Sequence, residues 1–137
     1  MPKKVPELEI NVAEVVSHLK LTGQFQSALG EVVKRKITAD TAKKRGTKIS
    51  AKELQKAADV FRIDNGLYKA SQTEQWLKSN GISLEAFEDY LETSLLINKF
   101  KDALEAKANT KKYLSSPAVK SSVREMVYED WFSKAVK

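Results

Sequence analysis

Paired helix-start signals recur along this chain and point to a fold built from helices. The segments Ser50–Glu53 (SAKE) and Ser71–Glu74 (SQTE) both have the form of a capping box. In this motif the first side chain accepts a hydrogen bond from a backbone N–H three residues on, and the acidic side chain bonds back. These bonds satisfy N–H groups that a helix start leaves without partners, so both segments predict helix starts. Asn11 with Glu14 has the same spacing and predicts a third.

The apolar residues between these signals recur at three- and four-residue steps, which is typical of amphipathic helices. Glycines follow the predicted helix ends, as they commonly do. We expect six helices, over about residues 11–21, 24–45, 51–65, 72–80 and 84–108 and a last one that starts at Ser116–Pro117. One face of the second should carry Phe25, Leu29, Val32, Val33 and Ile37. One face of the last should carry Val119, Val123, Met126, Val127, Trp131 and Ala135.

The composition favours one all-α domain over residues 1–137. The chain has 5 Gly and 3 Pro, which are few for a protein with the many turns of a β-sandwich. Its 42% hydrophobic and 31% charged residues are typical of a globular protein that can bury a single core. The cluster Leu95–Ile97 in the long helix is wider than one stripe and predicts burial on more than one side.

The residue types that most enzymes need are missing or isolated. The chain has no cysteine, which excludes disulfides, thiolate metal sites and a cysteine nucleophile. His18 is its one histidine, so we expect no zinc or iron site and no cofactor. The acids at 85, 88, 89 and 92 suit the start of a helix, where the helix dipole favours negative charge. We therefore expect a protein without catalytic activity.

Neither a signal peptide nor a membrane span is evident in the sequence. The first ten residues lack an apolar run of the length that a signal peptide needs. No stretch approaches the roughly 18 apolar residues of a transmembrane helix. We expect a cytoplasmic protein that does not insert into membranes.

A series of short segments, in a fixed order, resembles a known family. They are Leu21–Phe25, Ile49–Leu54, Ala57–Arg62, Gly66–Leu67, Trp76–Leu77, Asn80–Ser83, Phe87–Leu91 and Leu95–Lys99. Together they resemble the N-terminal helical domain of SurA-like parvulin chaperones, whose design is related to PrsA and the trigger factor C-terminal domain. The resemblance implies an orthogonal array of helices, with a long C-terminal helix packed back on it, that holds unfolded polypeptide.

In that family a parvulin prolyl-isomerase domain normally follows the helical domain, and a final helix then returns. Here the chain passes from the long helix through 111–114 directly to the helix that starts at Pro117. Parvulin catalysis uses paired histidines in a β-rich site, and this chain has neither feature. The resemblance thus implies the holding part of the family without its catalytic part.

Large aromatic and Met side chains are the candidates for contact with a bound polypeptide, because they bury much area and adapt their shape. We predict a peptide-binding surface that contains Trp76, Phe87, Tyr90, Met126, Trp131 and Phe132. The alternative is that these side chains simply form the core, as most helical stripes do. Tyr90 and Phe132 lie beside the main stripes of their helices and are the better candidates for exposure.

A basic stretch precedes the predicted stop at Gly46. It contains Lys34, Arg35, Lys36, Lys43, Lys44, Arg45 and Lys48. With the net charge of +6, its residues Lys34, Arg35, Lys43, Lys44 and Arg45 are predicted to form a basic rim that attracts an acidic or leader-type polypeptide. The alternative is a solvated helix face.

Two further functions remain open from the sequence. One is a homodimeric helical scaffold, since the short connection between the last two helices could allow exchange between subunits. The other is a nucleic-acid-binding module, which we do not favour because no aromatic or glycine-rich nucleic-acid motif accompanies the basic stretch.

Overall fold

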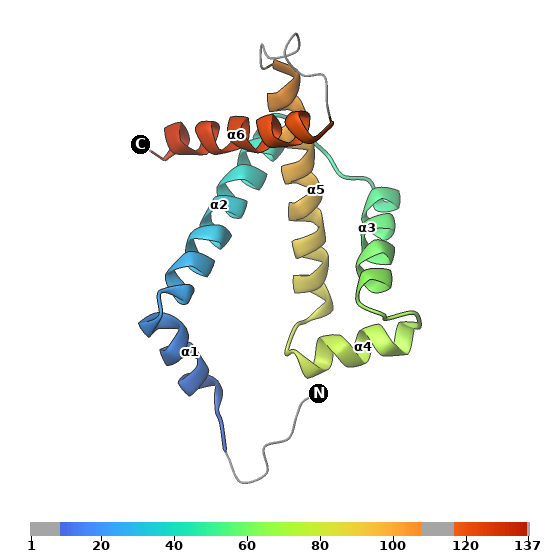
Figure 1. Ribbon diagram of the computed structural model, residues 1–137. Helices are drawn as coiled ribbons and strands as arrows, with labels where there is room; N and C mark the ends of the chain where they lie inside the picture. The colour runs from blue at the N-terminus through green and yellow to red at the C-terminus, as the bar shows by residue number, and fades with distance from the viewer. Residues whose placement is uncertain (1–8, 108–116, 137) are drawn as a thin grey trace. The chain divides into compact units, whose positions relative to one another are not determined.

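The computed structural model describes the backbone of residues 9–107 and 117–136, and the side chains of 9–107 and 121–136. Within these ranges the chain forms six helices and no strand, which confirms the predicted all-α fold (Figure 1). The helices are α1 (Val12–Leu21), α2 (Gln24–Lys44), α3 (Ala51–Asp64), α4 (Ala70–Ser79), α5 (Leu84–Lys107) and α6 (Pro117–Ala135). Among the described helices, none combines the length and hydropathy needed to cross a lipid bilayer.

The chain divides into two compact units, Met1–Lys34 and Arg35–Lys137, with the boundary inside α2. The prediction of one domain over residues 1–137 stays a prediction. In the first unit, Asn11 and Glu14 form the expected capping box, with hydrogen bonds of 2.9 and 3.0 Å. Gly23, at φ +83°, then provides the left-handed backbone that lets α2 start directly after α1.

The second unit contains two buried clusters. The first joins α2 to α5 through Ala39, Ala42, Leu96 and Phe100, with Ile49, Leu104 and Trp131 packed against it. Both alanines are buried and pack against the larger side chains of α5. The second cluster joins α4 to α5 through Leu77, Phe87 and Leu91, and Leu54 and Phe61 of α3 pack against it. Burial on more than one side of α5, predicted from Leu95–Ile97, is thereby confirmed.

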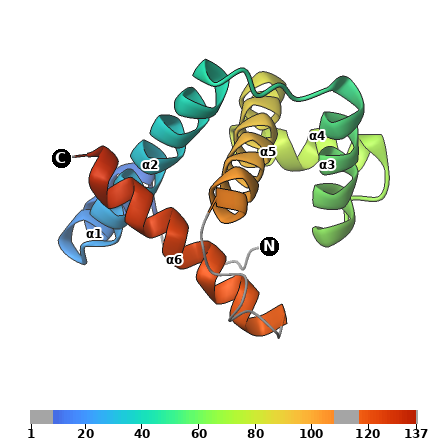
Figure 2. The ribbon, with the colours of Figure 1, turned by 90° about the horizontal axis from the view of Figure 1, so that it is seen from above.

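The final helix α6 packs back across the C-terminal half of α5, as the resemblance implied (Figures 1 and 2). The Arg124 guanidinium donates hydrogen bonds to Asp102, to Glu105 and to the carbonyl of Asn98. Partial burial alone would lower the pKa of Arg124, but its bonds to the two carboxylates outweigh that effect and raise it. The Tyr128 hydroxyl is buried and lies 3.1 Å from that of Thr38 on α2.

The start of α4 differs from the prediction. The helix begins at Ala70 and not at Gln72, and the segment Ser71–Glu74 is no capping box. The Gln72 side chain instead accepts a 2.8 Å hydrogen bond from the backbone N–H of Lys69. Thr73 connects α4 to α3, because its hydroxyl accepts a 3.1 Å hydrogen bond from Arg62 of α3.

Two predicted apolar faces are less buried than their periodicity suggested. On α6, Met126 is 67% exposed and Tyr128 is buried in its place. The reason is that Tyr128 and Trp131 share the side of α6 that meets α5. On α2, Leu29, Val32 and Val33 are exposed, and the buried residues are Thr38, Ala39 and Ala42 further along the helix.

The start of α3 is fixed by Glu53. Its carboxylate accepts a 2.9 Å bond from the Ser50 backbone N–H and pairs with Lys99 of α5 at 2.9 Å. The bond from Ser50, followed by the contact with Lys99, lowers the pKa of Glu53 to about 2. The predicted capping box at Ser50–Glu53 is confirmed, and the same carboxylate ties α3 to α5.

We expect Glu53→Gln to lower stability at neutral pH and to flatten the dependence of stability on acid. A carboxyl with a lowered folded-state pKa stabilises the fold above its unfolded pKa, about 4.3. That contribution is lost as the pH falls towards about 2. Thermal unfolding of both proteins from pH 7 to pH 2 would measure it, with Glu88→Gln as a control. Parallel curves for wild type and Glu53→Gln would contradict this role.

Shortening a side chain at the centre of the first cluster should strongly lower the stability of the fold. Leu96 is 1% exposed, so Leu96→Ala should lower the free energy of unfolding by about 2–5 kcal/mol through lost burial and a residual cavity. Met126→Ala, at an exposed site, should change it by about 0.5 kcal/mol or less. Urea titration followed by circular dichroism would compare them. Equal effects would mean that the packing described for α5 and α6 is incorrect.

Candidate functional site

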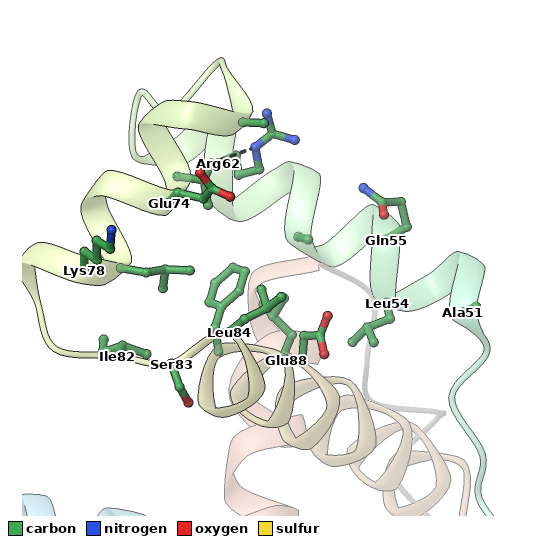
Figure 3. A pocket seen from close by; sticks show the side chains of 16 residues that line it. Ala51, Leu54, Gln55, Arg62, Glu74, Lys78, Ile82, Ser83, Leu84 and Glu88 are labelled. Atoms are coloured by element: carbon green, nitrogen blue, oxygen red, sulfur yellow. Dashed lines mark hydrogen bonds between the residues drawn. The ribbon is translucent and has the colours of Figure 1, made fainter.

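An apolar groove opens between α3, α4 and α5 within the second unit (Figure 3). Its volume is about 710 Å³. Figure 3 shows α5 along one side, with Leu84 and Glu88, and α3 and α4 along the other, with Leu54, Glu74 and Lys78. The apolar side chains that line it are Ala51, Leu54, Ala58, Ala70, Leu77, Ile82, Leu84, Phe87 and Leu91.

The floor of the groove is the second buried cluster. Phe61 of α3 holds this cluster together through two edge-to-face contacts, at 5.4 Å to Trp76 and 5.0 Å to Phe87 between ring centroids. Leu77 and Leu91 are buried next to them. Edge-to-face pairs stabilise beyond the area they bury, so the floor should be a fixed surface against which a ligand packs.

The connection between α4 and α5 forms an apolar lip. Gly81, at φ +65°, turns the chain, and the Ile82 N–H donates a 2.9 Å bond to the Leu77 carbonyl. The Ser83 hydroxyl then accepts a 3.0 Å bond from the Ala86 N–H and starts α5, as predicted. Leu84 follows directly and remains 61% exposed beside the opening. The turn thus presents a large aliphatic side chain to solvent at the mouth of the groove.

The charged residues at the rim fall into two groups. Arg62 is held in place, because it donates to Thr73 and to the carbonyl of Leu67 and pairs with Asp59. Glu74, Lys78 and Glu88 take no part in the ion pairs that the structure gives for the described residues. Charges of both signs therefore surround an apolar floor.

The groove has the chemistry of a binding surface. Its lining offers aliphatic and aromatic contact with a few polar groups at the edge, as ligand sites commonly do. Within residues 9–107 and 117–136, no group of His, Asp and Glu side chains is arranged to hold a metal ion. His18 lies in the first unit and not in the groove lining.

The six residues predicted to contact polypeptide form two packed pairs and two separate exposed sites. Trp76 and Phe87 belong to the groove's floor cluster, and Phe87 lines the groove itself. Trp131 packs edge-to-face on Phe100 at 4.7 Å, with Phe132 beside it on α6. Tyr90 and Met126 are exposed on α5 and α6. The structure does not join them in one wall, and their role in binding stays a prediction.

The predicted basic rim also lies away from the groove lining. Arg35 donates to the Tyr90 carbonyl and to Ser94 and stacks over the Tyr90 ring at 4.5 Å. Arg45 lies over the Phe100 ring at 4.8 Å. Lys44 pairs with Asp40, Lys43 is exposed, and Lys34 is half-buried at the end of the first unit. The two arginines thus contribute to packing within the second unit.

A family model described as the SurA-like N-terminal domain matches residues 13–101. The chain belongs to this family. Comparison with curated proteins and with solved structures gives no match. The matched region contains α1 to α4 and most of α5, so the three helices that form the groove are all part of the SurA-like N-terminal domain.

The sequence analysis missed the lip of the groove, although a signal for it was present. Ile82 precedes the Ser83 cap, and Phe87 is the fourth residue of α5. An apolar pair at these positions is the hydrophobic staple that fixes how a chain enters a helix. This pattern places Ile82 at the entry to α5, whereas Leu84 continues the stripe of Phe87 and Leu91 and stays exposed; both residues line the groove.

Proposed function

We propose that this SurA-like N-terminal domain binds apolar segments of unfolded or leader-type polypeptides in the groove between α3, α4 and α5. The observation that carries the proposal is an open groove of about 710 Å³ with an apolar floor, inside the region that the family model matches. Ligand sites in proteins commonly have volumes of about 300–1,000 Å³. A groove of this size accommodates a few apolar side chains of a polypeptide, and a longer segment would extend beyond it.

The groove's construction favours loose selectivity. Leu54, Leu77 and Leu84 offer contacts that depend on apolar area and not on a particular donor or acceptor. Binding a short flexible segment also costs chain entropy, so the affinity should be modest. The +6 charge of the chain favours acidic segments, while Glu74 and Glu88 at the rim suit occasional basic residues.

Binding without catalysis is part of the proposal. The apolar lining with isolated rim charges offers no paired acid and base next to a nucleophile. The chain also lacks the paired histidines that its resemblance to parvulin chaperones would require for isomerase activity. The domain therefore acts as a holding surface for polypeptide.

We expect Leu84→Gln to weaken polypeptide binding about 5- to 10-fold, because the wild-type leucine buries its exposed surface against the bound segment. The matched control is Met126→Gln, which alters another exposed apolar residue on α6, outside the groove. Fluorescence anisotropy with labelled apolar peptides would measure the dissociation constants, and circular dichroism would confirm that both variants fold.

Two outcomes would count against the proposal. Equal affinities for Leu84→Gln, Met126→Gln and wild type would exclude the groove as the site. Binding of DNA or RNA that weakens steeply with salt, without any peptide binding, would instead favour the nucleic-acid function.

A further inference from the structure

In residues 9–34, the described part of the first unit, each helix carries an apolar stripe that stays exposed. Among residues 9–34 no side chain is buried, and the apolar ones that reach half-burial are Val16, Leu19 and Phe25. The exposed members of the stripe are Val12 and Val15 on α1 and Leu29, Val32 and Val33 on α2, with exposed fractions between 43% and 77%. They recur at three- and four-residue steps, which places them on one face of each helix.

The local structure of this unit is well specified despite the missing core. Asn11 and Glu14 cap α1, Thr22 bonds the carbonyls of His18 and Leu19, and Gly23 makes the turn. Isolated helices as short as α1 are marginal in water, even with good capping. An ordered helix pair with an exposed apolar stripe thus points to a partner that covers the stripe.

We infer that the stripe is covered by the same stripe of a second copy of this chain. The five aliphatic side chains expose on the order of 500 Å². A standard interface buries about 800 Å² on each partner, of which somewhat more than half is apolar. The stripe therefore supplies the apolar part of one symmetric interface, with polar neighbours at the edge.

The type of side chain also favours a fixed partner. Valine is stiff because branching at Cβ restricts its rotamers, and the stripe contains neither Met nor an exposed aromatic ring. Surfaces that accept varied partners are typically flexible and rich in Met. A rigid stripe of similar residues on two helices suits a self-complementary contact about a twofold axis.

Charge makes this the favourable place for two copies to meet. The first unit, residues 1–34, contains four lysines and four glutamates, which gives a net charge of zero, whereas the whole chain carries +6. Contact through the first unit thus keeps the positive surfaces of the two chains out of the interface. The proposed dimer leaves the groove between α3, α4 and α5 outside the contact, because the groove belongs to the second unit.

The test is the mass in solution of the full chain and two variants, by sedimentation equilibrium over the micromolar range. Wild type should show twice the 15.4 kDa of one chain. The double variant Leu29→Gln/Val32→Gln should weaken the dimer by about 100-fold or more, since it removes four apolar side chains from a symmetric interface. Val60→Gln, at a 49% exposed site on α3, should remain dimeric.

A spin label gives an independent result, because the chain has no cysteine of its own. Ser27→Cys places one label on the exposed side of α2, away from the stripe. The wild-type background should give a defined distance between two labels, and the double variant should give none.

A wild-type mass of 15.4 kDa throughout the series would overturn the inference. A monomeric wild type with a less stable double variant would mean that other residues of the same chain cover the stripe. A monomeric wild type with peptide-induced NMR shifts at Val32 would mean that a bound polypeptide covers it. A dimer that survives the double substitution would place the interface elsewhere. The double variant should still bind peptide, because the groove lies in the second unit. A loss of the dimer with retained peptide binding therefore tests the stripe independently of the groove.

Discussion

The second unit depends on the way α5 buries two pairs of residues that face different directions. Phe87 and Leu91 are one turn apart, and so are Leu96 and Phe100. The five-residue step from Leu91 to Leu96 rotates the helix face by about 140°. The first pair therefore packs against α3 and α4, while the second pair packs against α2 with Trp131 of α6 alongside. One helix thus organises the elements on both of its sides.

The groove follows from this arrangement. Phe61 fills the space between Trp76 and Phe87, so the floor is closed, but the N-terminal end of α5 is covered on part of its circumference only. The Ser83 cap then fixes where the first turn of α5 begins. Leu84 remains 61% exposed beside the floor, one turn before the buried Phe87.

The helices could be predicted from the sequence because their signals are local. Asn11 and Ser50 need only a glutamate three residues on, and both boxes are present. The start of α4 was wrongly predicted from the Ser71–Glu74 pattern, because the Gln72 side chain bonds back to the Lys69 N–H and the helix begins at Ala70. The burial of Tyr128 in place of Met126 depends on how α6 lies across α5.

The candidate site was harder to predict than the fold. Trp76, Tyr90 and Trp131 were grouped by residue type, but each has a different partner in the structure. Trp76 contacts Phe61, Tyr90 contacts Arg35 and Trp131 contacts Phe100. The sequence also did not show that Arg35 and Arg45 stack on aromatic rings of α5. A groove consists of the surface that packing leaves uncovered, and the periodicity of a single helix carries little information about it.

We propose that polypeptide binds in the groove of the SurA-like N-terminal domain. Paramagnetic relaxation enhancement from a spin-labelled apolar peptide bound to ¹⁵N-labelled protein tests this most directly. We expect broadening of amide signals on the groove side of α3, α4 and the first turns of α5, including Leu54 and Leu84. Broadening centred on α1 or α6, or none at saturating peptide, would contradict it.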